Sequence, residues 1–123
     1  MATTLRNMNR SISERSLYER MVNIRDIRWD SEQHTILVGD ITISLTPTEY
    51  RLLFPLRGGM PVTYADLAML AYNYTVDEKV RTMMDKHIDR IRGKLRGSGV
   101  YVYCVLGYGY MLLPEQQTQD VAV

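Results

Sequence analysis

The side chains best suited to chemistry in this sequence are basic, and they gather in one segment. Residues 77–97 hold seven basic and four acidic side chains, a net charge of +3, in a chain of 123 residues whose total is only +1. The bases are Lys79, Arg81, Lys86, Arg90, Arg92, Lys94 and Arg96. Such groups pair with phosphates, and a guanidinium also forms two parallel hydrogen bonds with guanine. The segment therefore predicts contact with nucleic acid, and a charged face exposed only to water is the simpler alternative.

Other kinds of site have little support in the sequence. Cys104 is the single cysteine, so neither an intrachain disulfide nor a Cys-x-x-Cys metal site can form. We expect it to be buried and inert inside a strand. The run 107–109, Gly-Tyr-Gly, has no helix after it and predicts a tight hairpin rather than a phosphate cradle. No nucleophile, base or paired-carboxylate arrangement is indicated, and we expect no enzyme activity, no cofactor and no metal.

An amphipathic helix over about 77–96 must carry these bases. Its apolar residues recur at helical spacing, at Val80, Met83, Met84, His87, Ile88, Ile91 and Leu95. The face opposite this stripe contains Thr82, Asp85, Lys86, Asp89 and Gly93, with Lys79 and Arg90 on one flank and Arg81 and Arg92 on the other. A helix of about 20 residues is ~30 Å long, and its width matches the major groove of DNA. Such a face can contact bases centrally and phosphates laterally.

The segments before this helix predict a sheet and two shorter helices. Alternating apolar residues from Ile24 to Leu45 indicate about three short antiparallel strands. The run 46–49, Thr-Pro-Thr-Glu, is typical of a helix start, and Pro55 should stop or kink that helix. Thr63 and Asp66 predict a capping box that opens a helix over 64–72, and its buried face is expected to be Leu67, Leu70 and Ala71.

The last structured segment, 100–113, predicts a β-hairpin that turns at 106–109. The fold class is therefore α+β: a winged helix-turn-helix with a short N-terminal antiparallel sheet, three helices and a C-terminal hairpin wing. We predict one domain over 23–113, a polar tail over 1–22 in which a short helix from about Ile12 to Val22 is an option, and a polar tail over 114–123. No run of ~20 apolar residues and no export signal is present, so we expect a cytoplasmic protein without a membrane span.

Three separated motifs give the sequence a family resemblance. They are LTPTEY at 45–50, HIDRIRGKL at 87–95 and GYGY at 107–110. Together they resemble the OmpR/PhoB-type effector domain of bacterial response regulators in two-component systems, over about Ile24 to Leu113. The resemblance implies that Arg90 reads a base edge in the major groove, and that Lys86 and Arg92 hold phosphates.

The resemblance also implies DNA contacts outside the centre of the helix. Tyr72 would pack on the DNA backbone, and the Tyr110 hydroxyl would reach a phosphate. His87 is expected to be a partly buried packing residue, with phosphate contact as the alternative. The remaining candidates for the DNA surface are Arg81, Lys79, Thr82, Asp89 and Tyr108.

Three positions depart from the family pattern. Leu106 stands where family members usually carry an arginine that enters the minor groove, and we expect packing or a protein contact, with a wedge between bases as the lesser alternative. Thr82 replaces a common phosphate-binding arginine, which weakens nonspecific attraction. Asp89 places a carboxylate where a neutral or basic residue is usual. It can accept from a cytosine amino group, but an interaction with a neighbour such as Asp85 or Lys86 is the simpler expectation.

The predicted function is sequence-specific binding of double-stranded DNA by a bacterial transcriptional regulator. The helix over 77–96 would enter the major groove, and the wing over 100–113 would lie on the backbone or in the minor groove. The alternative is a protein-interaction module that contacts RNA polymerase or a partner regulator. A homodimer on tandem half-sites is a further option. About twenty residues before the fold leave no room for a receiver, so we expect a free-standing domain or one regulated by a partner or by expression level.

Overall fold

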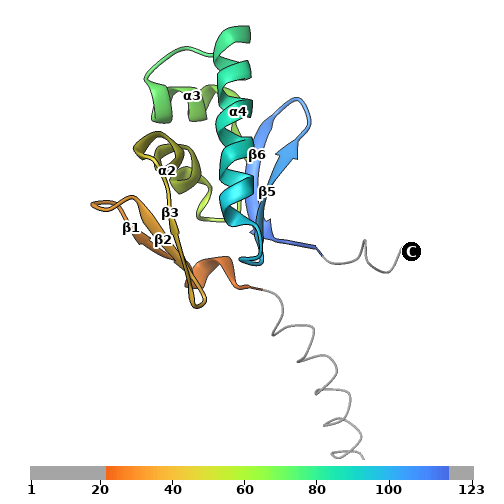
Figure 1. Ribbon diagram of the computed structural model, residues 1–123. Helices are drawn as coiled ribbons and strands as arrows, with labels where there is room; N and C mark the ends of the chain where they lie inside the picture. Colours follow the sequence, from red (N-terminus) through yellow and green to blue (C-terminus); the bar gives the residue numbers. More distant parts are fainter. Residues whose placement is uncertain (1–21, 117–123) are drawn as a thin grey trace, which may run out of the picture.

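A computed structural model describes residues 22–116, and the predicted winged helix-turn-helix is confirmed there (Figure 1). The predicted helix from about Ile12 to Val22 lies outside these residues, apart from Val22 itself, which packs against the core. The described elements in chain order are η1 (Ile24–Asp26), β1 (Arg28–Asp30), β2 (Thr35–Val38), β3 (Ile41–Ser44), α2 (Pro47–Leu53), η2 (Phe54–Leu56), β4 (Val62–Thr63), α3 (Tyr64–Tyr72), α4 (Glu78–Leu95), β5 (Val100–Val105) and β6 (Gly109–Pro114).

The N-terminal sheet is antiparallel in the order β1-β2-β3, as the alternation predicted. Trp29 pairs with Ile36, and Ile36 pairs with Ile43 across the sheet, so apolar side chains share one face. The strands begin later than the alternation indicated. Residues 24–26 form the 3-10 turn η1 instead, because the side chain of Asn23 accepts a hydrogen bond from the backbone of Arg25 and caps that turn.

Helix α2 begins as its capping signal predicted. The Thr46 hydroxyl accepts from the Glu49 backbone at 3.1 Å, and the Glu49 carboxylate accepts from the Thr46 backbone at 2.8 Å. The capping box is therefore complete. The α-helix ends at Leu53, and Pro55 lies in the 3-10 turn η2, because proline cannot supply the N–H that would continue the helix.

Helix α3 has the predicted bounds but a different buried face. The Thr63 hydroxyl accepts from the Asp66 backbone at 3.1 Å, which is one half of the predicted capping box. The prediction that Leu70 is buried was wrong, since its side chain is exposed. The predicted burial of Leu67 and Ala71 is confirmed, and Tyr64 and Ala68 are buried with them on one helical face.

The wing is a three-stranded sheet rather than a hairpin alone. Strands β5 and β6 pair antiparallel, and the two-residue strand β4 adds to the other edge of β6. Sequence patterning missed β4 because two residues carry no periodicity. Gly109 makes this pairing possible: a Cβ at that position would lie 1.7 Å from the Val62 carbonyl oxygen, so only glycine lets the strands approach.

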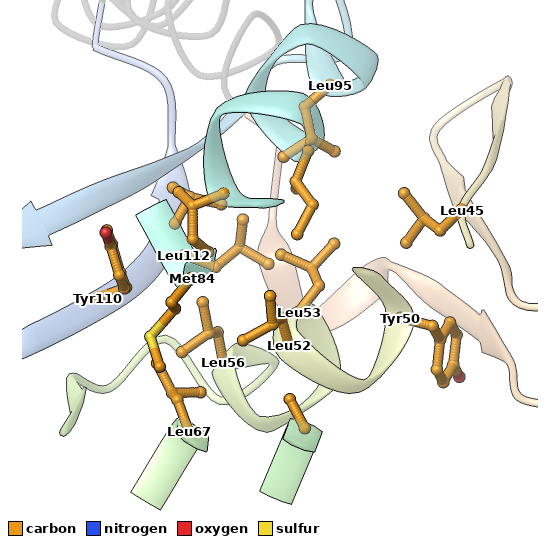
Figure 2. Close-up of a cluster of buried hydrophobic side chains, with 14 of the residues drawn as sticks. Leu45, Tyr50, Leu52, Leu53, Leu56, Leu67, Met84, Leu95, Tyr110 and Leu112 are labelled. Carbon is orange, nitrogen blue, oxygen red and sulfur yellow. The ribbon is translucent and has the colours of Figure 1, made fainter. Parts of the chain in front are cut away.

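Helix α4 lies between the α2–α3 pair and the wing (Figure 1). It buries five residues of its apolar stripe, namely Val80, Met84, Ile88, Ile91 and Leu95. Met84 and Leu95 belong to one buried cluster with Leu52, Leu53 and Leu56 of α2 and η2 and with Leu112 of β6 (Figure 2). Each such side chain contributes roughly 1.5 to 3 kcal/mol on burial, so α4 is fixed in orientation by the core it completes.

Candidate nucleic-acid interface

Three bases form one open stripe along the outer side of α4. The N-terminus of the helix is capped by Asp77, whose side chain accepts from the Val80 backbone at 2.8 Å. Lys79, Lys86 and Arg90 follow at helical spacing and line a shallow groove, together with Glu78, Thr82, Met83 and His87. None of the three bases pairs with another residue in the part of the chain that the structure describes. Their charges are therefore open to a ligand.

Two other bases of α4 are held by the fold. Arg92 donates from Nε to the Val102 carbonyl of β5 at 2.9 Å, and its Nη1 pairs with Asp89 at 3.1 Å. Lys94 donates from Nζ to the carboxylate of Glu49 in α2 at 2.5 Å. The phosphate contact expected of Arg92 stays a prediction, and in this structure its Nε and Nη1 are bonded within the fold. Asp89 interacts with a helix neighbour as expected, but with Arg92 rather than with Asp85 or Lys86.

Arg81 lies on the wing flank of the helix. Its guanidinium carbon sits 3.5 Å from the centre of the Tyr64 ring, a cation–π contact between α4 and α3. Its Nε is buried and has no hydrogen-bond partner among the described residues. Stacking fixes the plane of this guanidinium while leaving its terminal nitrogens unpaired by any described residue.

Tyr72 and His87 form a pair at the edge of the groove. The Tyr72 hydroxyl lies 2.8 Å from Nδ1 of His87, which joins α3 to α4. Burial, with a smaller effect of the Asp85 charge, raises the pKa of Tyr72 to about 12. Burial, followed by the charge of Arg90, lowers the pKa of His87. Both shifts keep these side chains neutral near pH 7, so the protonated hydroxyl can donate to the unprotonated ring nitrogen.

The wing tyrosines occupy different environments. Tyr110 is only 3% exposed, and its hydroxyl donates to the carboxylate of Asp85 in α4. The phosphate contact expected of Tyr110 stays a prediction, and it would require the hydroxyl to leave Asp85. Burial and this bond also raise the pKa of Tyr110. Tyr108, in the turn, is 47% exposed, and Leu106 beside it is 95% exposed.

Comparisons with known proteins match this architecture. No family model matches the chain, and no curated protein matches it. Among solved structures, the DNA-binding domain of the response regulator AdeR, in complex with an intercistronic region, is 24% identical, with a TM-score of 0.58 over 73% of this chain and 95% of that one. The DNA-binding domain of CpxR from E. coli is 20% identical, with a TM-score of 0.62 over 78% of this chain and 98% of that one.

The fold is that of OmpR/PhoB-type response-regulator DNA-binding domains. The structures behind this assignment are regulator domains rather than enzymes. A mutant of RitR is 31% identical, with a TM-score of 0.60 over 76% of this chain, but the match spans only 43% of RitR. Helix α4 (Glu78–Leu95) corresponds to the amphipathic helix that the sequence predicted over about 77–96.

The structure brings half of the ten predicted site residues to one surface. Lys79, Thr82, Lys86 and Arg90 share the groove on α4, with Tyr72 joined to it through His87. Arg81, Asp89, Arg92 and Tyr110 lie toward the wing and contact other residues of the fold. Tyr108 lies apart, in the wing turn. The groove on α4 therefore holds only part of the predicted set, and the roles of these residues stay predictions.

Two features of the site were missed or misplaced by sequence reasoning. Glu49 is 2% exposed and bonds Lys94, but its position predicted only a helix cap. The partner lies on a distant helix, and nothing in the local pattern indicates it. Cys104 was predicted to be buried and is exposed, with its sulfur 3.5 Å from the Tyr64 hydroxyl. It follows Val102 on the same face of β5, but the strand extends beyond the core there.

Within residues 22–116, no cluster of three or more His, Cys, Asp or Glu side chains is arranged to hold a metal ion. In the same residues, no helix is both long and apolar enough to span a membrane.

Proposed function

We propose that this chain binds double-stranded DNA sequence-specifically as a bacterial transcriptional regulator. The observation that carries the proposal is the unpaired basic stripe of Lys79, Lys86 and Arg90 on the outer face of α4. Solved domains with this fold include one in complex with an intercistronic region, which supports duplex DNA as the ligand class. Response regulators use such DNA binding to regulate transcription.

Helix α4 has the dimensions and the charge to enter the major groove. Its 18 residues span ~27 Å, and its width of ~10 to 12 Å fits a groove about 12 Å wide. The buried stripe fixes which face points outward. We propose that Arg90 pairs with guanine O6 and N7, while Lys79 and Lys86 hold phosphates beside it. Thr82 lies between them in the groove and is placed to contact a base or a phosphate.

The Tyr72–His87 pair supports the same surface from its edge. With Nδ1 bonded to Tyr72, the remaining ring nitrogen of His87 is available on the groove side as a donor to a phosphate. This makes Tyr72 a positioning residue in the proposal rather than a direct backbone contact. The wing would lie on the DNA backbone or in the minor groove, with Tyr108 as its exposed polar group.

The rival function is a protein-interaction module that contacts RNA polymerase or a partner regulator. The observation that favours it is the exposed apolar wing turn at Leu106 and Tyr108. The two functions differ in salt dependence. A DNA complex with several phosphate contacts weakens steeply as salt rises, because bound counterions are released on association.

Selection of binding sites from a random duplex pool tests the proposal. Wild type, Arg90→Ala, Lys86→Ala and the off-face control Arg28→Ala are each selected at low and moderate salt. We expect an enriched motif for wild type and for Arg28→Ala. Arg90→Ala should lose discrimination at one base position by about 1 to 3 kcal/mol, whereas Lys86→Ala should weaken all sequences alike. No enrichment at either salt, or equal effects of both variants on every sequence, contradicts the proposal.

A further inference from the structure

The wing turn is apolar and carries no charge. Residues 97–114 contain no acidic or basic side chain. At the turn itself, Leu106 is 95% exposed, so it packs against none of residues 22–116. Packing within the described residues therefore does not account for Leu106, and its side chain is open to contact with another molecule.

The turn is held rigidly. The backbone N–H of Tyr108 donates to the Val105 carbonyl at 2.8 Å. The backbone N–H of Tyr64 in α3 donates to the Tyr108 carbonyl at 2.9 Å. Gly107 has a positive φ of 72°, which glycine adopts without strain. Strand β4 closes the other edge of β6 beside Gly109. Leu106 is therefore presented on a fixed support and not on a loose loop.

The turn lies level with the N-terminal half of α4 (Figure 1). Arg92, near the C-terminal end of the helix, bonds Val102, whereas Arg81 near its start stacks on Tyr64, whose hydroxyl meets Cys104. The end of β5 next to the turn therefore lies nearer the N-terminus of α4 than the start of β5 does. The turn therefore lies at the level of the half of α4 that carries Lys79 and Thr82.

We propose that the wing turn inserts Leu106 into the minor groove as an apolar wedge and bends the duplex. This inference rests on the proposed DNA-binding function. An uncharged turn gains nothing from phosphates, but an apolar side chain placed between two base pairs buries its surface and kinks the duplex by ~20° to 90°. The unstacking costs least at pyrimidine–purine steps such as TA and CA. The wing would therefore select sequence through the deformability of the duplex.

Bending of the selected duplex tests this directly. Energy transfer between dyes at the two ends of the duplex is measured for wild type, for Leu106→Ala and for Ile41→Ala. Ile41 is an exposed apolar residue on β3, so its truncation is a matched control. We expect a bend for wild type and Ile41→Ala, and the end-to-end distance of free DNA for Leu106→Ala. Leu106 is almost fully exposed, so its truncation should not affect folding.

A second comparison uses duplexes that differ only at the wing step. Wild type should prefer a TA or CA step over an A-tract by about ten-fold, and Leu106→Ala should bind both equally. Leu106→Arg should reverse the preference, because a guanidinium is drawn to the narrow minor groove of an A-tract.

The outcomes separate the two proposals. An unbent wild-type complex, or a bend that Leu106→Ala retains, overturns the wedge and leaves DNA binding intact. A wild-type protein that selects no duplex at all overturns DNA binding, and the wedge with it.

Discussion

The outer face of α4 and its two flanks carry the same kinds of side chain in different states. On the outer face, Lys79, Lys86 and Arg90 are open, whereas on the flanks Arg92 and Lys94 bond to β5 and α2. Position relative to the core decides which bases serve the fold and which remain open to a ligand. The net charge of +3 over residues 77–97 therefore overstates the positive charge that is open to a DNA ligand.

The acidic residues of α4 also differ between the two sides of its outer face. Glu78, Asp85 and Asp89 each precede one base of the open stripe, so they form a parallel stripe one position away. Asp85 and Asp89 are tied toward the wing through Tyr110 and Arg92. The positive side of the outer face is consequently the side next to α3, and phosphate contacts are expected there rather than beside the wing.

Lys94→Ala should give the largest effect on stability. It leaves the buried Glu49 carboxylate without its ionic partner, and we expect a loss of about 3 kcal/mol in the free energy of unfolding, the low end for a broken buried pair because Lys94 is partly exposed. Urea denaturation measures the loss. Lys86→Ala removes the same side chain from the open face and should change stability by less than about 0.5 kcal/mol. Equal losses in the two variants would contradict the distinction between Lys94, which is bonded within the fold, and Lys86, which is open to a ligand.

The same pair should give stability a pH dependence. Burial alone raises the pKa of Glu49, but the bonds and charge of Lys94 and the Thr46 cap outweigh it, and the net pKa lies below 4.5. A lowered folded-state pKa contributes stability that is present above 4.5 and lost as pH falls through the folded value. Wild type should therefore lose this contribution below about pH 4.5. Lys94→Ala removes the strongest of the effects that lower this pKa, so the variant should lose less stability than wild type over the same acid range, and identical pH profiles would contradict the assignment.

Tyr110→Phe should have a smaller effect. It removes the bond between the wing and Asp85, and we expect a loss of about 1 to 2 kcal/mol in the free energy of unfolding, since a partly buried carboxylate loses its donor. Tyr108→Phe deletes a hydroxyl from the same wing where no described residue bonds it, and serves as the control. Thermal denaturation of both variants makes the comparison. A Tyr110→Phe protein as stable as Tyr108→Phe would mean that this bond does not hold the wing to α4.

Local patterns predicted the elements, and long-range contacts decided the site. The Thr46 capping box, the α4 stripe and the wing glycines are properties of short segments, so the sequence predicted them well. The pairings of Lys94 with Glu49, and of Tyr110 with Asp85, join distant segments and have no local signature. The helical wheel placed Arg92 on the outer flank correctly but could not show that β5 supplies a carbonyl there.

The salt dependence of DNA affinity tests the central claim most directly. The selected duplex is titrated across salt concentrations with wild type, with Lys79→Ala/Lys86→Ala and with Arg25→Ala/Arg28→Ala, two exposed bases of the N-terminal segment. Both variants change the net charge equally. We expect that losing the two α4 lysines makes the slope of log affinity against log salt shallower by about 1.8, at about 0.9 per phosphate contact, while the control keeps the wild-type slope. The same slope for all three proteins would contradict the claim that the outer face of α4 binds DNA.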